Sequence, residues 1–267
     1  MKKLAALLLA LAMVLSLAAC GQKKVQLEIL STEYAVEDYA IAIAKENEEL
    51  LSEVNEALAA ITADGTAQKI VDKYISGTDH GLTFQADAGD KPELIMATNA
   101  QFPPYEYYED NKIVGIDAEM AAAIADYMGR KLVIDDMEFD ATITAVQTGK
   151  AHMAMAGMTV TPTRLESVSF SDSYATGIQV VVVPEGSPIK SVDDLLNPDA
   201  SYLAGVQRMT TGDIYLSDSY ENGGITEERV SKFDNGASAI QALLTGKVDC
   251  VVIDNEPAKA FVEANNQ

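Results

Sequence analysis

The sequence predicts an α/β protein with mostly parallel sheets. Short apolar runs of strand type alternate with segments of helical spacing, which is the pattern of this class. Hydrophobic residues make up 48% of the chain and charged residues 22%, as in a folded globular protein. This composition excludes a disordered chain, a collagen and a multi-span membrane protein. The length of 267 residues allows one or two domains.

The N-terminus has the features of a secretory signal peptide. A basic start at Lys2 and Lys3 precedes residues 4–19, which are apolar apart from one serine. This run is shorter than the ~20 residues that a membrane-spanning helix needs. The sequence Leu17-Ala18-Ala19-Cys20 resembles the bacterial lipobox, which implies cleavage before Cys20 and a lipid on that cysteine. The alternative is an ordinary signal peptide with a chance cysteine.

Two strands and two helices are expected in the first quarter of the mature chain. Apolar positions from Asn47 onward follow helical spacing, with Asn47 as the N-cap and Gly65 as the stop. Thr66 can cap a second, shorter helix. The expected ranges are 25–31 and 34–44 for the strands, and 47–65 and 66–75 for the helices.

Residues 76–92 are the best candidate for a linker, because they are polar and contain three glycines and a proline. Beyond them, strands and helices alternate, apart from a turn-rich aromatic stretch at 102–108. Strands are expected over 93–98, 132–134, 151–156, 179–184, 202–206 and 250–253, and helices over 117–129, 139–149, 191–196, from about 211, and over 237–245.

The charge and the residue counts restrict the possible partners. The chain has 41 acidic and 19 basic residues, for a formal net charge of −22. Such a surface repels phosphate, so no nucleic-acid partner is expected. Two cysteines and two histidines are too few for a structural zinc site or a disulfide scaffold, and the acidic residues show no metal-loop spacing. We therefore expect neither a metal nor a cofactor.

No catalytic residue is expected either. The chain contains no phosphate loop, no Gly-x-Ser-x-Gly elbow and no His-Glu-x-x-His motif. Cys250 lies in an apolar run of strand type, which is typical of a buried thiol. A catalytic cysteine needs a histidine partner, and neither His80 nor His152 shows one.

A group of polar and aromatic residues lies where expected strands end. Ligands of open α/β sheets bind outside the carboxyl ends of the strands. Taken singly, each residue is better explained as a cap, a turn or a surface charge, but together they indicate a ligand site. The group comprises Phe102, Phe139, Gly157, Thr159, Arg164, Gln207, Thr211 and Asp254.

With these residues in place, the chain resembles the bacterial extracellular solute-binding proteins of family 3, the amino-acid receptors of ABC importers. Residues 97–117, 156–174 and 246–258 carry the resemblance, which covers nearly all of 25–267. It implies a two-lobed fold of the type II periplasmic-binding-protein class. Each lobe would be a mostly parallel sheet flanked by helices, and two hinge strands would join the lobes.

The order of the segments departs from this family. Residues 34–75 resemble its C-terminal segment, yet here they precede the stretch that opens other members. We expect a circular permutation, in which the linker joins the former termini; chain ends that lie close together make this feasible. The alternative is a truncated or misassembled gene, although no family segment is missing.

The resemblance and the permuted order imply a division of the chain. The expected parts are a signal peptide over 1–19, a lipid-anchored tether over 20–24, lobe 1 over 39–177, lobe 2 over 25–33 and 179–267, and hinges near 34–40 and 175–181.

The resemblance also implies how the two charges of a free amino acid are held. Arg164 and Thr159 of lobe 1 would bind the carboxylate, with Thr211 of lobe 2 adding a donor at a helix start. Asp254 of lobe 2 would bind the ammonium group, helped by the carbonyl of Gly157. Only closure of the lobes would assemble the whole site, so a ligand would favour the closed state.

The ligand's side chain would lie between Phe102 and Phe139, and its polar end would face Asn99, Glu106 and Gln207. Family members that bind basic ligands often have an acid at the position of Asn99. A polar or amide side chain is therefore at least as well supported as a cationic one.

A second departure from the family lies beside the pocket. Arg208 and Met209 replace a glycine-rich turn. Met209 could narrow the pocket, and Arg208 could favour an acidic or longer ligand.

The function implied is that of a monomeric binding protein, not an enzyme. Lipid at Cys20 would hold it at the outer face of the cell membrane, where it would capture a polar L-amino acid and deliver it to an ABC transporter permease. Two other classes stay open: a sensory amino-acid-binding protein that signals to a partner, and a dehydratase-like enzyme on the same scaffold.

Overall fold

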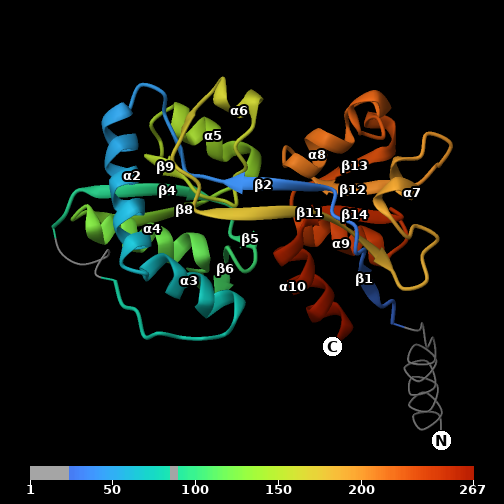
Figure 1. Cartoon of the computed structure of the whole chain (residues 1–267), viewed down its shortest axis with the longest axis horizontal. Coiled ribbons are helices and arrows are strands. Elements are labelled where there is room, and N and C mark those ends of the chain that lie inside the picture. The colour runs from blue at the N-terminus through green and yellow to red at the C-terminus, as the bar shows by residue number, and fades with distance from the viewer. Residues whose placement is uncertain (1–23, 85–89) are drawn as a thin grey trace, which may run out of the picture.

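A computed structural model describes residues 24–84 and 90–267. The predicted signal peptide, Cys20 and most of the tether lie outside the described residues. The described part has two α/β lobes connected by two long strands (Figure 1), as expected. None of the helices in this part is long and apolar enough to cross a membrane.

Lobe 1 contains a five-stranded sheet in the order β10-β3-β9-β4-β8. Helix α4 contributes the buried side chains of Met120 and Ile124 to the core of lobe 1. The aromatic stretch forms a separate small sheet, β5-β6-β7. The strands are β3 (Ala42–Ile43), β4 (Glu93–Thr98), β5 (Gln101–Phe102), β6 (Glu106–Glu109), β7 (Lys112–Val114), β8 (Lys131–Asp136), β9 (Met153–Ala154) and β10 (Ser169–Phe170). The helices are α2 (Glu48–Ala63), α3 (Thr66–Ile75), α4 (Ile116–Tyr127), α5 (Phe139–Gln147) and α6 (Pro162–Leu165).

Lobe 2 contains a sheet in the order β1-β11-β14-β12-β13. Its strand β14 buries Cys250 as a free thiol, as expected from the sequence. The strands are β1 (Leu27–Ile29), β11 (Ala175–Pro184), β12 (Ala204–Gln207), β13 (Val230–Phe233) and β14 (Cys250–Asp254). The helices are α7 (Val192–Leu196), α8 (Thr211–Leu216), α9 (Gly236–Leu244) and α10 (Asn255–Asn266), with 3-10 turns at Tyr220–Asn222 and Glu227–Arg229.

The two sheets are mixed, which corrects the expectation of mostly parallel sheets. Parallel pairs are those of β4 with β8 and β9, and of β12 with β13 and β14. The other pairs in these two sheets are antiparallel. Parallel neighbours need a helical crossover. The connecting strand β11 pairs antiparallel with β1, β2 (Ala35–Tyr39) and β14, and β3 pairs antiparallel with β9 and β10. These pairs are not built from a strand, a crossover helix and a parallel strand in sequence.

Strand β2 (Ala35–Tyr39) and strand β11 form the connection between the lobes (Figure 1). They pair antiparallel, from Ala35 opposite Gln179 to Tyr39 opposite Ala175. Beyond this ladder, the chain after β2 enters the sheet of lobe 1, whereas β11 continues into the sheet of lobe 2. Residues of this ladder therefore lie next to both lobes.

Of the two N-caps predicted from the sequence, the structure confirms one and contradicts the other. The Asn47 side chain accepts a hydrogen bond from the Leu50 backbone N–H, as expected of an N-cap. Thr66 is not a cap, because it is already the first residue of α3. Gly65 ends α2 and precedes α3 with a φ of 83°, a left-handed conformation that glycine adopts without steric cost.

Helix α10 is absent from the sequence-based expectations. It begins Asn-Glu-Pro and ends in polar residues, which is also the composition of a turn. Pro257 lies in its first turn, where the missing backbone N–H leaves no helical hydrogen bond unmade. Packing of Ala258 against lobe 2 supplies the burial that the local sequence does not reveal.

Candidate functional site

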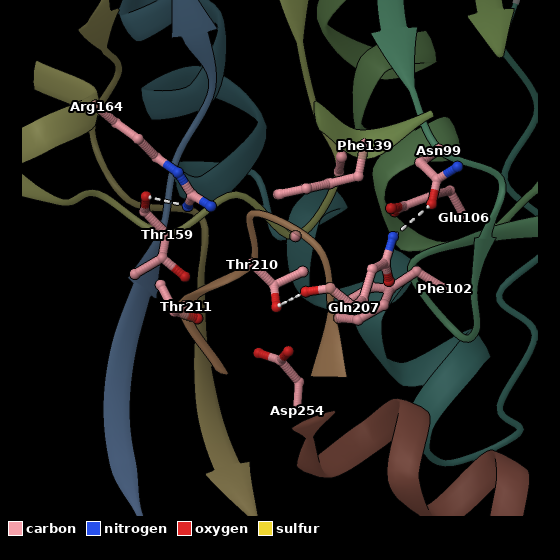
Figure 2. A pocket seen from close by; sticks show the side chains of 12 residues that line it. Asn99, Phe102, Glu106, Phe139, Thr159, Arg164, Gln207, Thr210, Thr211 and Asp254 are labelled. Atoms are coloured by element: carbon pink, nitrogen blue, oxygen red, sulfur yellow. Dashed lines mark hydrogen bonds between the residues drawn. The ribbon is translucent and has the colours of Figure 1, made fainter. Parts of the chain in front are cut away.

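A pocket lies between the two lobes, at the carboxyl ends of β4, β9, β12 and β14 (Figure 2). It encloses about 320 Å³ of empty space, open solvent included. All nine residues proposed from the sequence for ligand binding line this pocket, together with Glu106. The lining residues are Asn99, Phe102, Glu106, Phe139, Ala156, Gly157, Thr159, Arg164, Gln207, Thr210, Thr211 and Asp254.

Arg164 is a buried cation on the lobe 1 side of the pocket. Its position is set by α6, where the Thr161 side chain accepts a hydrogen bond from the Arg164 backbone N–H at 3.2 Å. The guanidinium Nη1 donates to the Thr159 carbonyl at 2.8 Å, and Nη2 donates to the Met209 carbonyl at 3.0 Å. Its Cζ lies 5.4 Å from the centre of the Phe139 ring. Within the described residues, no carboxylate oxygen lies within 4.0 Å of the guanidinium.

Burial lowers the pKa of Arg164, and nearby carboxylates such as Glu37 act in the opposite direction. An arginine nevertheless stays charged at neutral pH, since its ordinary pKa is above about 12. Among the described residues, only carbonyl oxygens bond this buried positive charge, which makes it a strong site for an anion.

Asp254 is a buried acid on the lobe 2 side. It ends β14 and precedes α10, but its side chain does not cap that helix. Instead, its Oδ1 accepts a hydrogen bond from the Tyr39 hydroxyl. In the described part of the chain, it has no lysine or arginine within ion-pair distance.

The pKa of Asp254 is raised to about 7, first by burial and then by the nearby Glu37 carboxylate. Hydrogen bonds from Tyr39 and Gln179 act against this increase. The carboxyl group is thus near its midpoint at neutral pH, and a cation in the pocket would favour its ionised form.

Glu37 of β2 is a central residue that the sequence analysis missed. Its buried Oε2 accepts hydrogen bonds from the Thr159 hydroxyl at 3.0 Å and from Gln179 Nε2 at 3.1 Å. Gln179 Nε2 also lies 3.2 Å from the Thr211 hydroxyl oxygen, to which it donates. The hydroxyl of Thr159, expected to face a ligand carboxylate, therefore donates to Glu37 in this structure. The sequence did contain a signal for Glu37. In a strand over 34–44, Glu37 and Tyr39 lie on the same face, so an acid two residues from an aromatic side chain could have been expected to point into the protein.

The far end of the pocket is closed by an amide pair. Gln207 Nε2 of lobe 2 donates to Asn99 Oδ1 of lobe 1 at 3.0 Å, and Asn99 Nδ2 donates to the Met137 carbonyl at 2.8 Å. Phe102 lies against Gly157, whose φ is 53°. A Cβ at Gly157 would come within 2.7 Å of the Phe102 ring, so both the backbone and the packing favour glycine there.

Two buried carboxyl groups lie beside each other at this end. Glu106 lines the pocket, and no donor from the described residues reaches either of its carboxyl oxygens. Asp117 of α4 lies within hydrogen-bonding reach of Glu106. Its Oδ2 accepts from the Gly157 backbone N–H at 2.9 Å and from the Tyr174 hydroxyl at 2.8 Å, while its Oδ1 has no donor.

Both of these acids hold protons more tightly than usual. Burial, followed by the neighbouring Asp117, raises the pKa of Glu106 well above its usual range. Burial also raises the pKa of Asp117, against the lowering effect of its hydrogen bonds from Gly157 and Tyr174.

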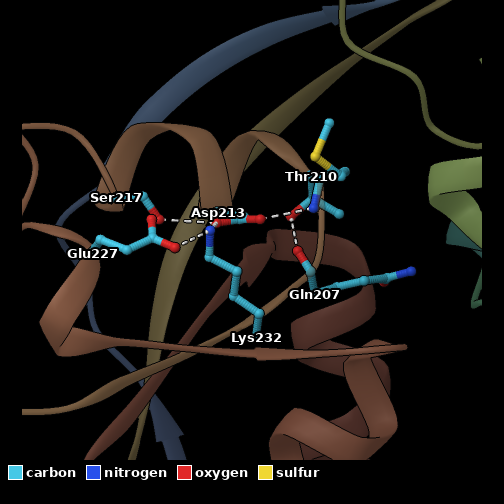
Figure 3. A network of polar contacts seen from close by, with 7 residues as sticks. Gln207, Thr210, Asp213, Ser217, Glu227 and Lys232 are labelled. Atoms are coloured by element: carbon cyan, nitrogen blue, oxygen red, sulfur yellow. Dashed lines mark hydrogen bonds and ion pairs between the residues drawn. The ribbon is translucent and has the colours of Figure 1, made fainter.

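The loop between β12 and α8 is held by a polar network around Asp213 (Figure 3). Asp213 Oδ2 accepts from the Met209 backbone N–H at 2.8 Å. Its Oδ1 accepts from the Ser217 hydroxyl at 2.9 Å and pairs with Lys232 Nζ at 3.0 Å. This network fixes the loop that follows Gln207, and the Met209 carbonyl of that loop accepts a hydrogen bond from Arg164.

The structure places neither Arg208 nor Met209 among the residues that line the pocket. The Met209 side chain is 54% exposed. The Arg208 guanidinium lies 2.9 Å from an Asp234 carboxylate oxygen and 3.8 Å from one of Asp140. The effects on ligand size and charge expected of these two residues are therefore not supported.

The histidines and possible metal ligands form no second centre in the part of the chain that is described. His152 Nδ1 accepts a hydrogen bond from the Ile95 backbone N–H at 2.8 Å, which explains it as a structural residue. No group of three or more histidine, cysteine, aspartate or glutamate side chains there could hold a metal ion.

The sequence matches a known family. The family model of the bacterial extracellular solute-binding proteins, family 3, matches residues 94–235. The chain is 32% identical over 186 residues to the arginine-binding extracellular protein ArtP of Bacillus subtilis (strain 168), and this match covers 70% of each chain.

Solved structures of similar proteins share the type II periplasmic-binding-protein fold. An ancestral arginine-binding protein bound to arginine is 38% identical, with a TM-score of 0.60 over 67% of this chain and 77% of that chain. The same kind of ancestral protein bound to glutamine is 38% identical, with a TM-score of 0.59 over 66% and 76%. The arginine-, lysine-, histidine-binding protein ArtJ of Geobacillus stearothermophilus is 32% identical, with a TM-score of 0.59 over 65% and 72%.

Proposed function

Because the chain belongs to the bacterial extracellular solute-binding proteins of family 3, we propose that it captures a free amino acid between its lobes and delivers it to an ABC transporter permease. One observation carries the proposal: Arg164 and Asp254, from different lobes, place a buried positive and a buried negative charge in one pocket. Neither has an oppositely charged side chain within ion-pair distance among the described residues. An amino acid supplies both missing partners, and each of its charges is costly to bury unless paired.

The roles proposed for the lining residues follow from this arrangement. Arg164 would take the α-carboxylate in a bidentate manner, with help from Thr159 and Thr211 after reorientation of their hydroxyls. Asp254 and the Gly157 carbonyl would take the ammonium group. Phe102 and Phe139 would enclose the aliphatic part of the side chain, and the residues of the amide pair and Glu106 would meet its polar end.

The ligand's side chain is proposed to be a cation or an amide. Four buried carboxyl groups lie in or beside the pocket, which one buried arginine lines, and they are Glu37, Glu106, Asp117 and Asp254. This excess of acids disfavours an anionic side chain and favours a positive one. The similar proteins bind arginine, lysine, histidine and, in one structure, glutamine, which supports the same two side-chain classes.

We also propose that the β2–β11 ladder is the hinge. The proposed boundaries remain lobe 1 over 39–177 and lobe 2 over 25–33 and 179–267. Contacts across the pocket, from Arg164 to Met209 and from Gln207 to Asn99, would be broken when the lobes open. A lipid on Cys20, outside the described residues, would attach the protein to the membrane through lobe 2.

A thermal-shift screen of the twenty amino acids, on the chain that starts at Gly21, tests this function. Arginine, lysine, histidine or glutamine should stabilise the protein by about 2.7 kcal/mol at a concentration of one hundred times Kd, which gives a clear increase in Tm. Agmatine, which is arginine without its carboxylate, is the matched control and should give no comparable increase. If none of the twenty amino acids raises Tm, the proposed function is wrong.

The circular permutation is a separate proposal, supported by contacts between the first and the last described segments of the chain. Asn266 Oδ1 accepts from the Leu27 backbone N–H at 3.0 Å, and its Nδ2 donates to the Leu27 carbonyl at 2.8 Å. Asn265 donates to the Val25 carbonyl at 2.8 Å. Helix α10 and strand β1 thus lie side by side, so a short peptide could join them. The family model begins only at Leu94, after the segments that we place last in the family order.

A chain relinked in the family order tests the permutation. Joining Gln267 to Val25 through a short glycine-serine linker, and opening the chain within 76–92, should preserve the fold and keep the affinity within a few-fold. Ends that already lie together can be joined without moving the core. Opening the chain after Val181 instead, within a buried strand, is the matched control and should prevent folding. Circular dichroism and calorimetry measure both, and an unfolded relinked chain would argue against the proposal.

A further inference from the structure

We propose that Glu106 and Asp117 share one proton in the free pocket, and that this proton leaves when a cationic side chain binds but stays when a neutral amide binds. The inference rests on the proposed function, because the pair lies at the end of the pocket that meets the ligand's side chain. It explains how one set of residues can accept two classes of amino acid.

The first step is the absence of donors around Glu106. Its side chain is fully buried and lines the pocket, and both of its oxygens lack a donor from the described residues. A buried carboxylate without donors is costly, whereas a protonated carboxyl group can satisfy itself by donating. The free pocket therefore favours the protonated form of Glu106.

The second step identifies the acceptor of that proton. Asp117 Oδ2 already accepts two hydrogen bonds, from Gly157 and Tyr174, which favour its ionised form. Its Oδ1 has no donor among the described residues, and Glu106 lies within reach. A proton on Glu106 that is donated to Asp117 Oδ1 satisfies both groups at once. Two close carboxyl groups in a buried site cannot easily both ionise.

The third step concerns the surroundings of the pair. The other titratable groups that act on it are the hydroxyls of Tyr105 and Tyr174 and the carboxyl groups of Asp136 and Asp254. None of these four is a cation, so nothing among them would stabilise a doubly ionised pair. A cationic ligand would bring to the pair the positive charge that these four groups lack.

The ligand then decides where the proton goes. A guanidinium or ammonium group near Glu106 favours its carboxylate, and the shared proton passes to solvent. The carboxylate then accepts N–H donors from the ligand. A neutral amide brings no charge, so Glu106 keeps its proton and continues to donate it to Asp117. The other oxygen of Glu106 then accepts a hydrogen bond from the amide N–H. One proton is released in the first case and none from this pair in the second.

Calorimetry with L-arginine and L-citrulline at pH 7 tests this directly. The two ligands have nearly the same shape, but citrulline replaces the guanidinium with a neutral urea group. Each titration is run in two buffers of different ionisation enthalpy, which yields the number of protons released. Arginine should release up to one proton more than citrulline. Protons lost from Asp254 contribute to both titrations and cancel in the difference. The affinity for arginine divided by the affinity for citrulline should also rise with pH, by at most about tenfold per pH unit.

Two variants locate the effect. Glu106→Gln should remove the difference in proton release between the ligands. Glu119→Gln is the matched control, because Glu119 lies on α4 like Asp117 but bonds Lys73 and Tyr74 and does not line the pocket, so the difference should persist. Because the contrast between the ligands is measured first on the unmodified protein, it does not depend on either variant folding.

Equal proton release for the two ligands would overturn the inference, as would a difference that persists in the Glu106→Gln protein. Binding of citrulline or glutamine without binding of arginine would also overturn it, while leaving the proposed amino-acid binding intact. If no amino acid binds at all, the proposed function fails, and the inference fails with it.

Discussion

Replacing Arg164 by alanine is expected to weaken amino-acid binding by two orders of magnitude or more. The ligand's carboxylate would then be buried without its positive partner, and breaking such a pair typically costs about 3–5 kcal/mol. Every 1.4 kcal/mol corresponds to about tenfold in affinity. The variant should fold, because the guanidinium bonds only two backbone carbonyls of the described chain. Isothermal titration calorimetry measures the affinity, and circular dichroism checks the fold.

Arg208→Ala is the matched control for this loss. Arg208 lies beside the same cleft but does not line the pocket, and its side chain is 47% exposed. Removing it subtracts the same charge from the protein without removing a ligand contact, so binding should change by only a few-fold. If Arg164→Ala binds as tightly as the unmodified protein, or if both variants lose binding equally, the assigned role of Arg164 is wrong.

Asp254→Asn should weaken binding by about 2–5 kcal/mol, the range found when one partner of a buried charge pair is removed. Asparagine has the same shape and can still accept the hydrogen bond from the Tyr39 hydroxyl. The loss should therefore come from the missing negative charge, and not from a changed fold. It should affect every amino-acid ligand, because all of them carry the α-ammonium group.

The pH dependence of binding gives a second readout for Asp254. The pKa of this carboxyl group is about 7 in the free protein, and pairing with an ammonium group would lower it in the complex. The contribution of Asp254 to affinity is therefore fully present above about pH 7. It is lost as the pH falls below 7, by at most about tenfold per unit. In the Asp254→Asn protein this part of the pH dependence should be absent.

The stability of the free protein should change in the opposite direction. The folded-state pKa of Asp254, about 7, lies above the ordinary value of 3.8, so the folded state binds the proton more tightly. Asp254 therefore destabilises the ionised folded protein, and the free energy of unfolding should fall as the pH rises from about 4 to about 7. The difference in unfolding free energy between the unmodified and Asp254→Asn proteins, measured by urea titration, isolates this effect.

Glu256→Gln is the matched control for both measurements. Glu256 also lies at the start of α10, but its carboxylate pairs with Lys259 and does not line the pocket. Its replacement should change neither the affinity nor its pH dependence by more than a few-fold. Full-strength binding by the Asp254→Asn protein at pH 7 would refute the role of Asp254 as the ammonium partner.

The fold class could be predicted from local patterns in the sequence, and the pocket residues from these patterns together with the family resemblance. Strands and helices follow from local periodicity and from caps such as Asn47, which involve residues a few positions apart. The carboxyl ends of neighbouring parallel strands lie at one edge of a sheet, so residues just after β4 and β9 had to meet in one lobe, and those just after β12 and β14 in the other. The family resemblance then implied that Asn99, Gly157, Gln207 and Asp254 belong to one pocket between the lobes, before its geometry was known. Their contacts with a ligand remain predictions.

The charge states of the carboxyl groups in that pocket depend instead on contacts between distant parts of the chain. Glu37 bonds Thr159 across 122 residues of chain, and Tyr39 bonds Asp254 across 215. The pairing of Glu106 with Asp117 likewise depends on how the small sheet of β5, β6 and β7 packs against α4. Whether a carboxyl group is ionised depends on its burial and on the donors and charges around it. Those neighbours come from distant parts of the chain, so local sequence patterns cannot reveal them.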